Sequence, residues 1–284
     1  MAPTAMLRRP AVRSVLLALC SGWLGASCVL ITALLVAPQR GSAAELQEIQ
    51  QRGHLIVAVK DNLRPLGFKN SQGQLEGLEI DIAHRLAAEL LGQPDAVVLQ
   101  PVSNQDRLSV VLNGEVDLAI ARVSATGSRA RLVDFSVPYY LDGTALVTRD
   151  VAVNQLSDLS NRAIAVLNGS TTIATVRSLF PNGRLVGVDS YQEASARLEA
   201  GDAAAFAADA SLLSGWVQEY PQYHLLPTLL STEALCIVMP RGIQYDPLRQ
   251  RINEAIAQWR QSGWLQERIR YWGLPQESSN PANP

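Results

Sequence analysis

Residues 55–59, Leu-Ile-Val-Ala-Val, form a short apolar run that is typical of a buried β-strand. A helical pattern follows over residues 79–91, and a strand-like run over residues 97–99 comes after it. Residues 108–112 then suit a helix, and residues 116–120 suit a third strand. Because strands joined through helices lie parallel to one another, this β-α-β-α-β order predicts a parallel sheet covered by helices.

A second unit of the same kind begins after Asp150. Its expected segments are a strand at 163–167, a helix at 172–179, a strand at 185–188, a helix at 191–200 and a strand at 203–207. The C-terminal part of the chain adds a strand at 234–239 and helices at 246–261 and 263–272. Two such units predict an α/β fold of two lobes with a cleft between them, onto which the carboxyl ends of the strands open.

The first 44 residues differ from the rest of the chain. They contain four arginines and no acidic residue, and the stretch from Ser14 to Val36 carries no charge. The small residues Ser42, Ala43 and Ala44 follow. A basic start, an apolar middle and a small-residue exit predict a secretory signal peptide. Because the apolar run is also long enough to cross a bilayer, an uncleaved membrane anchor is the alternative.

The composition restricts the function classes. Hydrophobic residues make up 48% of the chain and charged residues 18%, which is typical of a globular protein. Without residues 1–44 the chain keeps 20 of its 24 basic residues and all 26 acidic ones, a net charge of −6, which argues against nucleic-acid binding. Cys236 is then the one cysteine left, and we expect it to be a small buried residue. The three histidines show no metal-ligand spacing, so we predict no metal and no cofactor.

The most specific motif follows the third strand. Residues 126–129 read Thr-Gly-Ser-Arg, and residues 134–140 read Asp-Phe-Ser-Val-Pro-Tyr-Tyr. These segments resemble the signature of family 3 of the periplasmic solute-binding proteins, the polar amino-acid-binding proteins of ABC transporters. Residues 73–81 and 112–117 also match the family, and the matching segments follow the family's order over nearly the whole chain after residue 44. Within the family, the resemblance is to binders of glutamate, aspartate and glutamine.

The resemblance implies a type II periplasmic binding protein fold, in which two α/β lobes are joined by a two-strand hinge. We expect lobe 1 at 45–147 plus 237–275, lobe 2 at 148–236 and a flexible tail at 276–284. The hinge strands are expected near 145–149 and 233–236. The resemblance further implies a periplasmic monomer that closes around a free amino acid and presents it to an ABC permease in the inner membrane.

Three residues after the third strand are candidates for binding the ligand's carboxylate. A free amino acid carries a carboxylate and an ammonium on one carbon, and both need paired partners once they leave water. An arginine fork matches a carboxylate with two parallel hydrogen bonds. The resemblance assigns Arg129 to the α-carboxylate, with Ser124 and Thr126 contributing beside it. A surface salt bridge is the alternative for Arg129.

The second lobe supplies further candidates. Ser170 and Thr171 precede an expected helix, whose N-terminal amides suit an anion. The resemblance assigns the ligand's ammonium to Asp209. Asp209 also precedes a short helical pattern, so a helix cap is the alternative for this residue.

Selectivity for the ligand's side chain is predicted from cations near the first two strands. Lys60 stands where many family members have an aspartate, and Asn104 and Arg107 resemble a region of glutamate and aspartate binders. Two cations beside the distal end of the ligand would favour a second carboxylate and repel lysine or arginine. Solvation, or pairing with Asp61 and Asp106, is the alternative for Lys60 and Arg107, and a polar neutral amino acid such as glutamine or asparagine is then the next candidate ligand.

Two other functions remain open at this point. Some proteins of this fold are periplasmic dehydratases that act on prephenate-like acids, and Glu79 and Glu233 would be the acid-base candidates by residue type. A ligand-sensing receptor module would use the same cleft without a transporter. We expect a binding protein and not an enzyme.

Overall fold

The structure, a computed structural model, describes residues 44–276. The expected signal peptide or anchor, apart from Ala44, and the expected tail, apart from Gln276, lie outside the described residues. Between residues 44 and 276, no helix combines the length and the apolar character that a membrane span requires.

The first sheet contains the expected β-α-β-α-β unit. Its strands, in spatial order, are β5 (Val97–Pro101), β1 (Leu55–Val59), β6 (Leu118–Ile120), β15 (Val238–Met239) and β7 (Asp134–Phe135). β1 pairs in parallel with β5 and β6, whereas β15 runs antiparallel to β6 and β7. The short helix α3 (Ser109–Leu112) lies between β5 and β6 in the sequence, and α1 (Leu46–Arg52) precedes β1.

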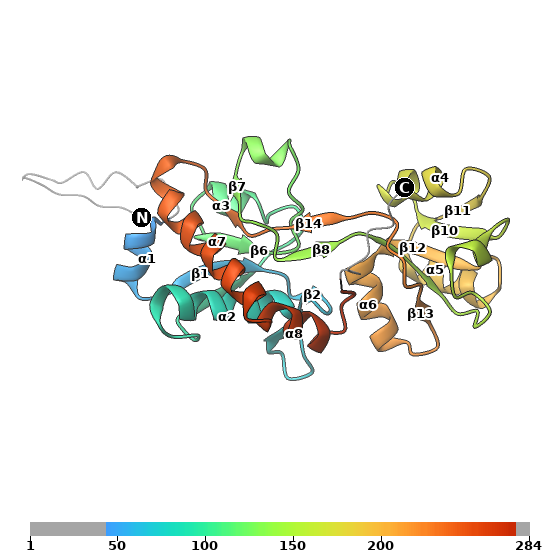
Figure 1. Cartoon of the computed structure of the whole chain (residues 1–284), viewed down its shortest axis with the longest axis horizontal. Helices are drawn as coiled ribbons and strands as arrows, with labels where there is room; N and C mark the ends of the chain where they lie inside the picture. The colour runs from blue at the N-terminus through green and yellow to red at the C-terminus, as the bar shows by residue number, and fades with distance from the viewer. Residues whose placement is uncertain (1–43, 277–284) are drawn as a thin grey trace, which may run out of the picture. The chain divides into compact units, whose positions relative to one another are not determined.

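Three helices build the core of this part. α2 (Leu78–Leu91) packs on β1 and β6, and α7 (Asp246–Gln261) and α8 (Trp264–Tyr271) pack against α2 (Figure 1). Ile82 and Leu86, which the helical spacing placed on one face, are fully buried. Their burial explains why α2 forms as an amphipathic helix on the sheet.

The second sheet repeats the pattern. Its strands, in spatial order, are β11 (Arg184–Val188), β10 (Ala163–Leu167), β12 (Ala205–Asp209), β9 (Thr144–Thr148) and β13 (His224–Leu225). β10 pairs in parallel with β11 and β12, whereas β9 runs antiparallel to β12 and β13. The helices that contact this sheet are α4 (Thr172–Leu179), α5 (Tyr191–Glu199) and α6 (Ala210–Glu219). The core around β12 is aromatic, because Phe206 packs against Trp216.

Two short strands lie where the chain passes between the sheets. β8 (Tyr140–Asp142) pairs antiparallel with β14 (Glu233–Leu235), and the two run side by side in Figure 1. Gly143 alone separates β8 from β9, and a Cβ atom at Gly143 would lie 1.8 Å from the carbonyl oxygen of Ser231. Only glycine fits this close approach.

One expected hinge position is therefore wrong. The strand near residues 145–149 is β9, which pairs with β12 inside the second sheet. All five of its residues are buried, so this strand fills a sheet interior instead of crossing between sheets. The expected hinge strand at 233–236 corresponds to β14.

Smaller differences concern strand bounds and short elements. The strand expected at 203–207 is β12, which extends to Asp209, and the run expected at 234–239 is split into β14 and β15. The small sheet of β2 (Asn62–Leu63), β3 (Gly67–Lys69) and β4 (Leu75–Glu76) was not expected, whereas α6 is the helix that the short pattern after Asp209 suggested. Three short 3-10 turns, η1 (Arg129–Arg131), η2 (Leu156–Leu159) and η3 (Ile243–Tyr245), complete the described elements.

Candidate ligand-binding site

A cavity of about 600 Å³ lies where β6 and β12 end, and residues that are far apart in the sequence line it. Its lining consists of Arg107, Arg122, Ser124, Ala125, Thr126, Arg129, Thr171, Asp209, Thr232, Glu233 and Ala234. Six of the nine predicted binding residues are in this set, and they include both Arg129 and Asp209. Cations and carboxylates therefore face one another across a space large enough for a small molecule.

Arg129 begins the turn η1 and is half-buried. Its Nη1 donates a hydrogen bond to the carbonyl oxygen of Ser124 at 3.0 Å, and its backbone N–H donates to Oγ1 of Thr126 at 3.4 Å. No carboxylate within residues 44–276 forms an ion pair with Arg129. The guanidinium thus keeps donors available for an anion in the cavity.

Asp209 is the last residue of β12 and the N-cap residue of α6. Its side chain makes no capping hydrogen bond, which argues against the helix cap as its main role. The carboxylate instead forms an ion pair with Nη2 of Arg122. Burial raises the pKa of Asp209, and the positive charge of Arg122 opposes this rise.

Arg122 was not predicted from the sequence, and it links the ends of both sheets. Its Nε lies 3.4 Å from a carboxylate oxygen of Asp142 and 3.4 Å from the hydroxyl of Ser211. Its backbone N–H donates to Oε1 of Glu79 at 2.6 Å. Burial lowers the pKa of Arg122, but the neighbouring carboxylates, led by Asp209, outweigh burial and raise it overall.

Arg107 lines the cavity beside Arg129, as the selectivity hypothesis requires. Its Nη1 donates to the carbonyl oxygen of Ala121 at 3.1 Å and also to that of Arg122. Burial and the neighbouring charges of Arg129 and Arg122 lower the pKa of Arg107. Arg107 is therefore a further cation of the cavity lining, in addition to Arg122 and Arg129.

Three predicted residues do not line this cavity. Lys60 is buried, and its Nζ donates to the carbonyl oxygen of Val102 at 2.8 Å, while burial lowers its pKa. Asn104 is exposed in the turn after β5. Ser170 precedes α4, and its Oγ is buried without a hydrogen-bond partner among the described residues. Of the second lobe's predicted pair, Thr171 alone reaches the cavity.

Residues 55–275 match the family of bacterial extracellular solute-binding proteins, family 3. The chain belongs to this family. The match covers both sheets and every residue of the cavity, so the family resemblance is confirmed, as is the expected class of two α/β lobes.

Relatives of this solute-binding protein are found among both sequences and structures. The chain is 35% identical over 191 residues to a glutamine-binding protein of Geobacillus stearothermophilus, covering 66% of this chain and 73% of the relative. It is 27% identical to the ABC transporter glutamine-binding protein GlnH of Bacillus subtilis, covering 80% and 84%. It also resembles a solute receptor for L-cysteine of Neisseria gonorrhoeae, with a TM-score of 0.60, 27% identity and coverage of 80% and 93%.

Glu233 and Glu79, the candidate acid-base residues, occupy different surroundings in this family member. Glu233 begins β14 and lines the cavity, where its Oε2 accepts a hydrogen bond from the Ser124 hydroxyl at 3.0 Å. Glu79 is fully buried on α2 and does not line the cavity. Its Oε1 accepts a hydrogen bond from the Tyr139 hydroxyl at 2.6 Å, and burial raises its pKa. Glu79 therefore contacts the backbone of the lining residue Arg122 but does not line the cavity itself.

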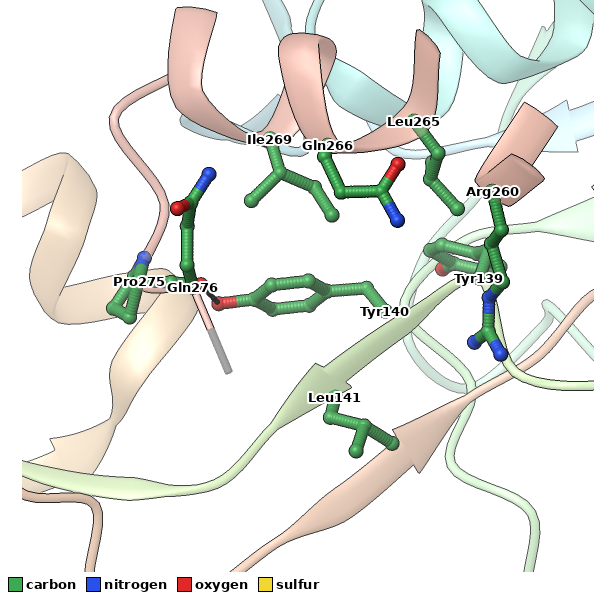
Figure 2. Close-up of a pocket in the computed structure, with 9 residues that line it drawn as sticks. All are labelled: Tyr139, Tyr140, Leu141, Arg260, Leu265, Gln266, Ile269, Pro275 and Gln276. Carbon is green, nitrogen blue, oxygen red and sulfur yellow. Dashed lines mark hydrogen bonds between the residues drawn. The ribbon is translucent and has the colours of Figure 1, made fainter. Parts of the chain in front are cut away.

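A second cavity of about 250 Å³ lies beside β8 in the solute-binding protein. Figure 2 shows the ring of Tyr140 facing side chains of α8, with its hydroxyl donating to the carbonyl oxygen of Pro275 at 3.2 Å. None of the predicted binding residues lines this cavity. Among the residues that the structure describes, no group of three or more His, Cys, Asp or Glu is arranged to hold a metal ion.

Proposed function

We propose that this family 3 protein binds a free polar amino acid in the 600 Å³ cavity, with an acidic amino acid favoured, and delivers it to an ABC permease. The observation that carries the proposal is that Arg129 and Asp209, opposite in charge, line one cavity, Arg129 from the turn between β6 and β7 of the first sheet and Asp209 from the end of β12 in the second sheet. A zwitterion needs such an arrangement, because each of its charges must be paired when it leaves water. The names of relatives, which include binders of glutamine and glutamate, support the same ligand class.

Each end of the ligand has a proposed partner. Arg129 binds the α-carboxylate, with Thr126 and Ser124 beside it, and Thr171 contributes from the N-terminus of α4. Asp209 binds the α-ammonium, and Glu233 is the second carboxylate within the cavity.

Arg107 is the proposed basis of the acidic preference. It lines the cavity close to Arg129, so a ligand with carboxylates at both ends places one on each guanidinium. Lys60 donates to a backbone carbonyl outside the cavity lining, so its contribution is a long-range charge. A lysine or arginine ligand would bring its side-chain cation towards Arg107 and be repelled.

The proposed mechanism is closure about β8 and β14 after the ligand binds one lobe. We place the lobe boundaries where the chain passes between the sheets, at Gly143 and Cys236, in place of the boundary expected after residue 147. Closure adds contacts from the second lobe and expels water from the cavity. The proposed setting is that of an exported periplasmic monomer, with or without a membrane tether at its N-terminus.

A thermal-shift screen of residues 45–284 against the twenty amino acids tests the proposal. A ligand that binds the folded protein alone raises the melting temperature. We expect glutamate and aspartate to give the largest shifts, glutamine and asparagine smaller ones, and lysine none. Stabilisation by lysine or arginine alone would contradict the acidic preference, and no shift from any amino acid would contradict the ligand class. Turnover of a prephenate-like acid would support the dehydratase alternative.

A further inference from the structure

Arg122 has an unusual backbone conformation at the end of β6. Its φ is 50°, in the left-handed region that favours glycine. An arginine in this conformation carries a conformational cost that glycine would avoid, and such outliers are often found where a side chain has a function. The conformation brings the guanidinium into the cavity lining.

Carboxylates surround the guanidinium of Arg122. It forms ion pairs with Asp209 and Asp142, and the charges of Glu233 and Glu79 also act on it. Without Arg122, both Asp209 and Asp142 would lose the cation with which they form ion pairs. An amino-acid ligand would bring the missing cation as its ammonium group.

The two paired carboxylates depend on Arg122 to different degrees. Asp142 also accepts hydrogen bonds from the backbone N–H groups of Gly143 and Ser211, each at 2.9 Å, and from the Ser211 hydroxyl. Within the described part of the chain, Asp209 has no such second set, because its side chain makes no capping bond and pairs with Arg122. Arg122 therefore pairs with Asp209, the carboxylate that binds the ligand's ammonium in the proposed function.

We propose that Arg122 is an internal surrogate for the ligand's ammonium group, which an amino acid must displace from Asp209 in order to bind. This inference rests on the proposed function of the cavity. The apparent affinity is lowered by the fraction of molecules in which Asp209 is occupied. An acid without an amino group forms no ion pair with Asp209 after Arg122 is displaced, so displacement does not strengthen its binding. Arg122 therefore raises the ligand concentration needed for binding and makes an ammonium group necessary.

Isothermal titration with L-glutamate and with glutarate, its analogue without the amino group, tests the inference. Arg122→Gly suits the observed φ and removes the surrogate. We expect it to lower the Kd for glutamate by about tenfold or more, because Asp209 becomes permanently free. Binding of glutarate should not tighten. Arg122→Lys keeps the positive charge but loses the forked guanidinium. Its Kd for glutamate should lie between those of the wild type and Arg122→Gly. Adding Asp209→Asn to Arg122→Gly should abolish the gain.

Several outcomes would overturn the inference. Unchanged or weaker glutamate binding by a folded Arg122→Gly protein, with wild-type binding intact, would make Arg122 a structural or ligand-contacting residue while the proposed function stands. An equal decrease in Kd for glutamate and for glutarate would mean that the Arg122 side chain only restricts the volume of the cavity. If neither protein bound glutamate, the inference would fail, and the amino-acid screen would decide separately on the proposed function. Circular dichroism and melting temperature establish folding; if Arg122→Gly is unfolded, Arg122→Met, which keeps an apolar stem, replaces it.

Discussion

Arg129 presents a guanidinium that pairs with no carboxylate among residues 44–276. If it holds the α-carboxylate, Arg129→Ala leaves a buried anion without its partner and costs about 2–5 kcal/mol of binding free energy. The fold should be intact, because the only acceptor among residues 44–276 that the guanidinium loses is the carbonyl oxygen of Ser124. Calorimetric titration with L-glutamate measures the change.

Arg131 offers a matched control for that experiment. It lies on the same turn, is exposed and does not line the cavity. Arg131→Ala should change the affinity for glutamate very little, since exposed charges contribute little to stability or to a distant site. An affinity loss below threefold for Arg129→Ala, or equal losses for both variants, would reject the role of Arg129.

Residues in the cavity differ in how far the sequence predicts them. Arg129 and Asp209 were predicted as binding residues because each follows a predicted strand and matches a position in the family's motifs. Arg122 was missed because the direction of its side chain depends on a positive φ, which no neighbouring residue signals. Lys60 was placed near the ligand from its position after β1, but its side chain turns to the carbonyl oxygen of Val102 and not into the cavity.

At the scale of elements, Gly143 joins β8 to β9 under a tight constraint. A Cβ atom there would lie 1.8 Å from the carbonyl oxygen of Ser231, so the two segments must separate to admit alanine. We expect Gly143→Ala to lower the free energy of unfolding by about 1–3 kcal/mol, as overpacking does. Urea unfolding monitored by circular dichroism measures this loss.

Gly127 provides the comparison for Gly143. A Cβ atom at Gly127 would meet nothing within 4 Å, and its φ is outside the left-handed region. Gly127→Ala should therefore leave stability within about 0.5 kcal/mol of the wild type, as most surface substitutions do. Similar losses at both positions would show that the close approach to Ser231 does not constrain the link.

α7 and β9 show which elements the sequence predicts well and which it does not. α7 was predicted with both bounds correct, because its apolar positions recur at helical spacing after Pro247. β9 was placed in the hinge that the family resemblance implies, because a short strand with an apolar centre suits either a sheet interior or a crossing strand. Its pairing with β12 decides between them, and pairing depends on segments sixty residues away.

At the scale of the whole molecule, Glu79 couples stability to pH. It is fully buried on α2, its Oε1 accepts hydrogen bonds from Tyr139 and from the Arg122 backbone, and its Oε2 has no partner among the described residues. Burial raises its pKa, so the folded protein holds this proton at pH values where the unfolded chain has lost it. Stability should therefore fall as the pH rises from the ordinary pKa of glutamate, about 4.3, through the raised value in the folded protein.

Glu79→Gln isolates this contribution from the other carboxylates. Glutamine keeps a carbonyl oxygen for the Tyr139 hydroxyl and the Arg122 N–H but does not titrate. The melting temperature of the variant, relative to that of the wild type, should rise as the pH increases from 4 to 8, because only the wild type loses a proton from a buried site. A difference that stays constant across this range would mean that Glu79 titrates alike in the folded and unfolded chains. A difference that falls with pH would mean that the arginines Arg107 and Arg122 outweigh burial and stabilise the carboxylate.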